Sequence, residues 1–145
     1  MEKQVSLRLN CASHLRFTDG GAPRLLGSRC SSCGETYFPK TGACTRCSST
    51  QMEVVELGDV GKLWAFTIQG FMPKKPYDGC QDASAFKPYG VGYVEMPSGV
   101  KVESRITVSE SEALKVGMDM KLVIEAYGTA PDGTSLNTYA FTPCP

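Results

Sequence analysis

Two Cys-x-x-Cys pairs form the part of the sequence whose residue types and spacing could do chemistry. They lie in the run RCSSCGETYFPKTGACTRC, residues 29–47, which holds four of the chain's seven cysteines: Cys30, Cys33, Cys44 and Cys47. Two such turns brought together supply four sulfurs in a tetrahedral arrangement, which suits Zn²⁺. Protein ligands would fill all four positions and leave none for water or substrate, so the predicted zinc site is structural.

Other uses of these thiols stay open on the sequence alone. A rubredoxin-like iron site takes the same four ligands. A redox dithiol would need only one pair and would lie in a βαβ context, which the flanking sequence lacks. Disulfides are disfavoured in a reducing compartment. Gly34 is expected to supply the unusual backbone angle of the first turn. Arg29, Lys40 and Arg46 either offset the thiolate charge or are ordinary surface charges.

No other set of residues in the sequence forms a catalytic group. The only histidine, His14, lies in a weakly patterned N-terminal stretch, so a nucleophile would find no obvious base. No glycine-rich phosphate loop joins a predicted strand to a helix. Cys11, Cys80 and Cys144 are spare thiols, of which Cys80 is the one candidate acyl acceptor. We therefore predict no catalytic residue and a chain that catalyses nothing alone.

Composition bounds the class of protein. The chain has 145 residues, and its 15 Lys plus Arg balance its 15 Asp plus Glu. Four thiolates around a divalent ion would bring the net charge to about −2, which argues against nucleic acid as a partner. No stretch approaches the roughly 20 apolar residues that cross a bilayer, and the N-terminus has no apolar signal segment. We expect a cytoplasmic protein with no membrane partner.

The elements that must position the cysteines are mainly strands. Residues 53–70 read as one long strand, bent at Gly58 and Gly61, and residues 88–108 as a hairpin turning at 97–99. A capping box of Ser109 and Glu112 predicts one or two helical turns that end at Gly117. Residues 120–128 and 135–143 read as two more strands, with a turn at 129–134.

These elements predict a mainly β protein, in which a small zinc ribbon precedes a five-stranded OB-fold barrel with one short helix. We divide the chain into an N-terminal extension (1–24), the zinc ribbon (25–52) and the OB-fold domain (53–145).

Four aromatic residues on predicted strands could stack nucleic-acid bases, but filling the barrel core is the favoured interpretation; they are Trp64, Phe66, Tyr93 and Tyr127. The irregular segment 71–88, long enough to be functional, carries Lys74, Lys75 and Lys87.

Several runs together resemble one family. LLGSRCSSCGETYFP, CTRC, GDVGKLWAFTI, PYGVGYVEMPSGVKVESRI and LKVGMDMKLVIEAYG are similar, in content and order, to the acyl-CoA-associated family that joins a rubredoxin-like zinc ribbon to an OB-fold domain. The similarity covers residues 25–142 and places the family's ribbon cysteines on the four named above. One departure is TGACTRC, which lacks the proline that relatives commonly have beside the third cysteine. Segment 71–88 is variable in such proteins, so no role is transferred to it.

The resemblance implies a non-catalytic accessory subunit of an acyl-CoA-processing or acyltransferase complex. Such proteins associate with thiolase-like condensing enzymes, hydroxymethylglutaryl-CoA synthase, MaoC-like hydratases and thiolase-like aldolases, and some belong to acyl-transfer complexes. The expected partners are thiolase-like subunits in a hetero-oligomer, together with acyl-CoA, whose phosphates Lys74, Lys75 and Lys87 could contact. The alternatives are a nucleic-acid-binding protein with a zinc ribbon and an OB-fold, and an acyl carrier or transferase that uses Cys80.

Overall fold

The computed structural model describes residues 7–145, which are built almost wholly from β-strands. Its helices are three 3-10 turns within those residues, and none is long and apolar enough to cross a bilayer. In chain order the elements are β1 (Leu7–Leu9), η1 (Ala12–His14), β2 (Leu15–Phe17), β3 (Pro23–Cys30), β4 (Thr36–Tyr37), β5 (Met52–Gly58), β6 (Val60–Gln69), η2 (Ala83–Ala85), β7 (Tyr89–Glu95), β8 (Lys101–Ile106), η3 (Ser111–Ala113), β9 (Asp119–Thr129) and β10 (Ser135–Pro143).

Strands β6 to β10 form the predicted five-stranded closed barrel. The pairing order is β10-β8-β7-β6-β9, and β9 pairs with β10 to close the circle. All pairings are antiparallel except that between β10 and β8, which is parallel and joins only two residue pairs. The predicted hairpin turns at 97–99 and the alternation along its second arm buries Val102, Ser104 and Ile106. This architecture confirms the predicted fold class.

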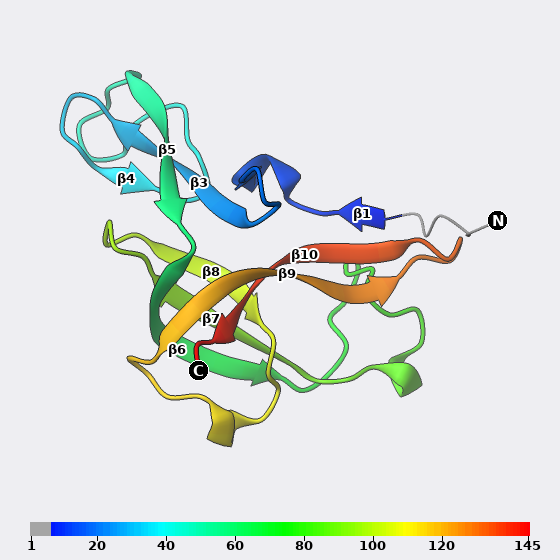
Figure 1. The fold of residues 1–145 in the computed structure, drawn as a ribbon. Helices are drawn as coiled ribbons and strands as arrows, with labels where there is room; N and C mark the ends of the chain where they lie inside the picture. The colour runs from blue at the N-terminus through cyan, green and yellow to red at the C-terminus, as the bar shows by residue number, and fades with distance from the viewer. Residues whose placement is uncertain (1–6) are drawn as a thin grey trace.

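The zinc-ribbon sheet lies at one end of the barrel, and β3 is its central strand (Figure 1). Strand β3 pairs antiparallel with β2, β4 and β5. The prediction of one long strand over 53–70 is therefore wrong, because β5 pairs in the ribbon while β6 pairs in the barrel. The chain turns between them at Gly58, whose φ of +94° suits glycine, and the carbonyl of Asp59 accepts a hydrogen bond from Leu122 N (2.7 Å).

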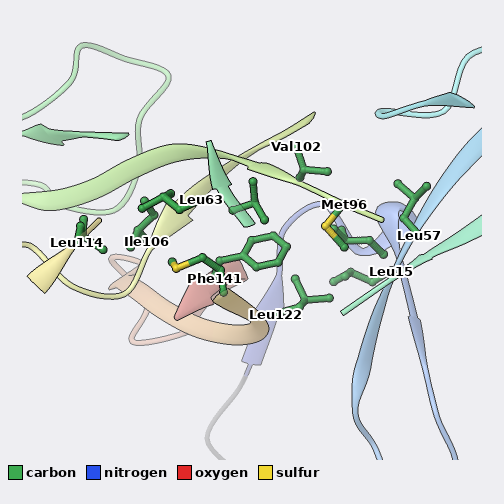
Figure 2. Packing of buried hydrophobic residues seen from close by; sticks show 12 residues of the cluster. Leu15, Leu57, Leu63, Met96, Val102, Ile106, Leu114, Leu122 and Phe141 are labelled. Carbon is green, nitrogen blue, oxygen red and sulfur yellow. The ribbon is translucent and has the colours of Figure 1, made fainter. Parts of the chain in front are cut away.

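A single hydrophobic core joins ribbon and barrel (Figure 2). Phe141, Leu63 and Leu122 fill the barrel, and each is at most 1% exposed. Leu15, Leu25 and Leu57 come from the ribbon sheet but belong to the same buried cluster. In Figure 2 Leu15 and Leu57 lie at one end of the cluster and Leu114 at the other. The ribbon is thus packed onto the barrel through side chains, beyond its covalent connection.

The short helix is smaller than the capping box predicted. Only Ser111–Ala113 form a 3-10 turn, and its N-cap is Glu110, which makes no capping hydrogen bond. The Ser109 hydroxyl bonds the carboxylate of Glu110 instead. The segment cannot extend, because Leu114 is buried and the N–H of Gly117 donates to the carbonyl of Leu63 (2.7 Å), which returns the chain to β6.

The N-terminal stretch is more ordered than its pattern indicated. Residues 1–6 of the predicted extension (1–24) lie outside the described residues. In the rest, β1 adds to the barrel in parallel with β10 (Figure 1), and β2 pairs with β3. Each of the two strands has only three residues, which is too short for a periodic signal.

Candidate functional site

The four cysteines of the two pairs come together in the ribbon. Cys30 ends β3, Cys33 follows it, and Cys44 and Cys47 lie in the connection from β4 to β5. Their sulfurs all lie within 4.8 Å of one another, and the Cys30–Cys47 and Cys33–Cys44 pairs are each 3.5 Å apart. Four sulfurs about 2.3 Å from a central zinc ion would be about 3.8 Å apart, so the arrangement fits Zn²⁺.

Two matching backbone turns hold the sulfurs. The N–H of Gly34 donates to the carbonyl of Cys30 (2.8 Å), and the N–H of Ser48 donates to the carbonyl of Cys44 (2.9 Å). The donor residue is left-handed in both turns, with φ of +83° at Gly34 and +65° at Ser48. Gly34 therefore has the role expected from the sequence, whereas Ser48 takes the same conformation despite its side chain, which costs roughly 1 kcal/mol.

The hydrogen bonds at the site shift the pKa values of the four thiols in different directions. The Tyr37 hydroxyl donates to the sulfur of Cys44 (3.2 Å), and this bond is the main reason that the pKa of Cys44 is lowered to about 6. A backbone N–H of Ser49 favours the thiolate of Cys47, but the contact with Cys30 and burial raise the pKa of that thiol to about 12. A bound dication would stabilise all four thiolates together.

The basic residues near the cysteines do not gather on the sulfurs. Arg46 pairs with the carboxylate of Glu35 (3.2 Å), and the Arg29 side chain lies against Gly34. Lys40 is exposed. Backbone N–H groups and the Tyr37 hydroxyl are therefore the nearer source of positive potential for the thiolates.

The three lysines predicted to contact CoA phosphates are all exposed on the segment between β6 and β7. They are Lys74, Lys75 and Lys87, and none forms an ion pair with another described residue. The segment that carries them is folded against the barrel. Asp78 accepts hydrogen bonds from Arg8 (2.6 Å) and from the hydroxyl of Tyr127 (2.9 Å), and Gly79 lies against Gly128.

The other two candidate groups, Cys80 and His14, make unrelated contacts. The sulfhydryl of Cys80 donates to the backbone carbonyl of Asp82 (3.0 Å). His14 packs edge-on against Phe38, with ring centroids 5.2 Å apart, and its Nδ1 is buried without a hydrogen-bond partner among the described residues. Neither contact pairs a nucleophile with a base.

A groove of about 610 Å³ runs along the outer face of β7 and β8, and sequence reasoning missed it. Its walls include Tyr89 and Tyr93 of β7, Glu103 and Arg105 of β8, Tyr77 of the 71–88 segment and Tyr139 of β10. In an OB-fold, the face of the second and third strands and the loop joining the first two are where ligands and partners commonly bind. Here those parts are β7, β8 and segment 71–88.

Three of the four aromatic residues predicted to fill the core lie at this groove instead: Trp64, Tyr93 and Tyr127. Trp64 is 51% exposed and Tyr93 42% exposed, and their rings meet edge to face at 6.1 Å. Phe66 does pack against the core. The pairing of β6 with β7 shifts between Leu63 and Ala65, which leaves Trp64 in a bulge. The alternation of buried and exposed positions along β6 was the sequence signal that could have predicted this, since a buried Leu63 places Trp64 on the outer face.

Two family models match the chain in consecutive order. Residues 18–53 match "ChsH2, rubredoxin-like zinc ribbon domain", and residues 54–125 match "ChsH2, C-terminal OB-fold domain". The first match and the spacing of the four sulfurs together identify structural zinc as the cofactor.

Several curated relatives match along most of their length. Benzoylsuccinyl-CoA thiolase subunit BbsA of Thauera aromatica is 29% identical over 123 residues, which cover 85% of this chain and 78% of that subunit. A DUF35 domain-containing scaffold protein of Pyrococcus furiosus is 31% identical over 121 residues, covering 83% of each chain. A solved structure, the Ltp2-ChsH2(DUF35) aldolase, has a similar fold, with a TM-score of 0.58 at 24% identity over 83% of this chain and 84% of that one.

Proposed function

This chain belongs to the ChsH2 family of zinc-ribbon and OB-fold proteins, and we propose on that basis that it is a non-catalytic accessory subunit of an acyl-CoA-processing complex. Its partners in this proposal are thiolase-like subunits, which supply the reacting side chains. The observation that carries the proposal is the match to a thiolase subunit, BbsA, along 85% of this chain. A relative named as a scaffold protein matches over a similar length.

The geometry supports an assembling role. A zinc ion held by four cysteines has no open position for substrate, so its contribution is to folding. The only histidine lies in an aromatic cluster, where it contacts Phe38 and Tyr139. A rigid ribbon and barrel with an ordered long segment can instead hold other subunits in register. The four thiols also need reducing conditions, which the cytoplasm provides.

The chain's own contribution to the substrate channel would come from segment 71–88. Lys74, Lys75 and Lys87 are exposed and have no carboxylate partner among the described residues, so each could pair with a phosphate of CoA. In this proposal the segment borders the acyl or CoA channel of the partner, and its lysines bind the anionic end of the cofactor.

Co-purification tests the proposal. The tagged chain is isolated from its native cell at low ionic strength, and the proteins that accompany it are identified by mass spectrometry. We expect stoichiometric thiolase-fold subunits, and CoA-dependent activity only in the complex. Recovery of RNA or DNA instead would contradict the proposal. So would acyl transfer by the isolated chain that is lost in Cys80→Ser.

A further inference from the structure

The groove on β7 and β8 has one charge that the chain itself does not neutralise. Arg105 pairs with Glu125 (2.9 Å) and Lys101 lies 3.7 Å from Glu95, so both cations in the wall have a carboxylate partner. Glu103 lies between them on β8, opposite Tyr93 of β7, and forms no ion pair within residues 7–145. The groove therefore has one carboxylate, that of Glu103, which no cation of the described residues neutralises.

The rings around Glu103 suit a flat cation. Tyr93 and Tyr139 line the same groove, and the Tyr139 hydroxyl donates to the backbone carbonyl of Glu103 (3.1 Å), which fixes the strand at that point. The chain already uses this chemistry nearby, since the Arg105 guanidinium lies 4.1 Å from the ring centre of Tyr89. An arginine can pair with a carboxylate and stack on tyrosine rings at once.

The rim of the groove carries the exposed apolar surface that a stable contact needs. Trp64 and Tyr93 form their edge-to-face pair there, and the Lys101 ammonium lies 4.7 Å above the Trp64 ring. Tryptophan, tyrosine and arginine are the residues that dominate binding energy at protein interfaces. A half-exposed tryptophan beside an aromatic groove is therefore a candidate anchor for a protein partner.

We propose that the groove and its Trp64–Tyr93 rim form the docking surface for the thiolase-fold subunit, which inserts an arginine side chain between the tyrosine rings to pair with Glu103. The inference rests on the proposed function for the identity of that subunit. The charges disfavour the other occupants. Nucleic acid would need free cations, and both cations of the wall are paired. A two-fold contact between copies of this chain would set the groove against the same wall, whose two cations are already paired.

The experiment uses the chain's single tryptophan. This chain alone is labelled with 5-fluorotryptophan, so that one fluorine resonance reports on Trp64. The thiolase-fold subunit recovered with the wild-type chain is then added. We expect the resonance to shift and to lose its contact with a soluble paramagnetic probe. By calorimetry we expect the affinity to fall about 30-fold in Trp64→Ala and about tenfold in Glu103→Gln.

Val116→Ala is the matched control, because Val116 is 66% exposed and lies outside the groove; its affinity should equal that of the wild type. Glu103→Gln preserves shape, so a loss of binding by that variant does not reflect misfolding. An unmoved resonance at saturation, or affinities within twofold of wild type in both groove variants, would overturn the docking surface and leave the proposed function standing. If no thiolase-fold subunit binds the wild-type chain, both fail. Protection of Trp64 only by RNA or by self-association would overturn the inference as well.

Discussion

The hydroxyl of Tyr37 lies 3.2 Å from the sulfur of Cys44 and also accepts a hydrogen bond from the N–H of Thr45 (3.1 Å). Tyr37 ends the two-residue strand β4, which pairs with the central strand of the ribbon. The contact ties one metal ligand to the sheet through a side chain that does not itself bind the ion.

Removal of this hydroxyl should weaken zinc binding without unfolding the ribbon. In Tyr37→Phe the Cys44 thiolate loses the donor that contributes most to its low pKa. Partners of this kind typically account for 10- to 100-fold in metal affinity, so we expect a loss of about tenfold in a chelator competition. Tyr93→Phe, which removes an exposed tyrosine hydroxyl, is the control. Equal zinc affinities in both variants would contradict the role given to Tyr37.

Loss of one sulfur ligand should prevent folding of the ribbon and, through the shared core, destabilise the barrel. Structural zinc contributes on the order of 10 kcal/mol, which is comparable to the whole stability of a domain. We therefore expect Cys33→Ser and Cys44→Ser to be insoluble or unable to assemble. Metal analysis and thermal unfolding measure this, and Cys80→Ser is the matched control. A zinc-free variant with the wild-type melting temperature would show that the ion is dispensable.

The packing of the 71–88 segment against β9 can be tested at one glycine. A Cβ at Gly128 would overlap the backbone of Gly79, and backbone cannot move aside as a side chain can. Gly128→Ala should lower the free energy of unfolding by about 2 kcal/mol and make the segment sensitive to proteases. Gly70→Ala is the control, because a Cβ there meets nothing within 4 Å. Equal cleavage of both variants would exclude this contact as the anchor.

Tyr139 should make stability depend on alkaline pH. Burial, then the negative charges of Cys11 and Glu103, raise its pKa to about 12, against about 10 for an unfolded phenol. As the pH rises, the unfolded chain ionises first, so this contribution is complete below about pH 10 and is lost between about pH 10 and 12. The expected loss is about 2 kcal/mol.

Urea unfolding at several alkaline pH values measures this slope. Tyr139→Phe should flatten it, because the phenylalanine ring has no proton to lose. Tyr93→Phe, at an exposed position, should leave the slope as in the wild type. Burial also raises the pKa values of Tyr77 and Tyr127, so part of the slope should remain in Tyr139→Phe. A slope as steep as that of the wild type in this variant would assign the effect to other groups.

Local sequence patterns were enough to predict most of the fold and the metal ligands. The Cys-x-x-Cys spacing selects ligands within a few residues, and the alternation over 100–108 fixes one face of β8. Contacts between residues that lie far apart in the sequence could not be predicted from such patterns. Strand β5 continues directly toward β6 in the sequence, yet it pairs with β3 because Leu57 packs with Leu15 and Leu25 in the core. The groove was missed for the same reason, since its walls come from seven separate parts of the chain.

The continuous core has a consequence for assembly. Leu25 of the ribbon and Phe141 of the barrel are both fully buried in one cluster, so the ribbon does not rotate as a separate unit against the barrel. The metal end and the grooved face of the molecule then keep a constant separation. A complex built on both would inherit that spacing, and a partner could adjust its own position but could not stretch this protein to fit.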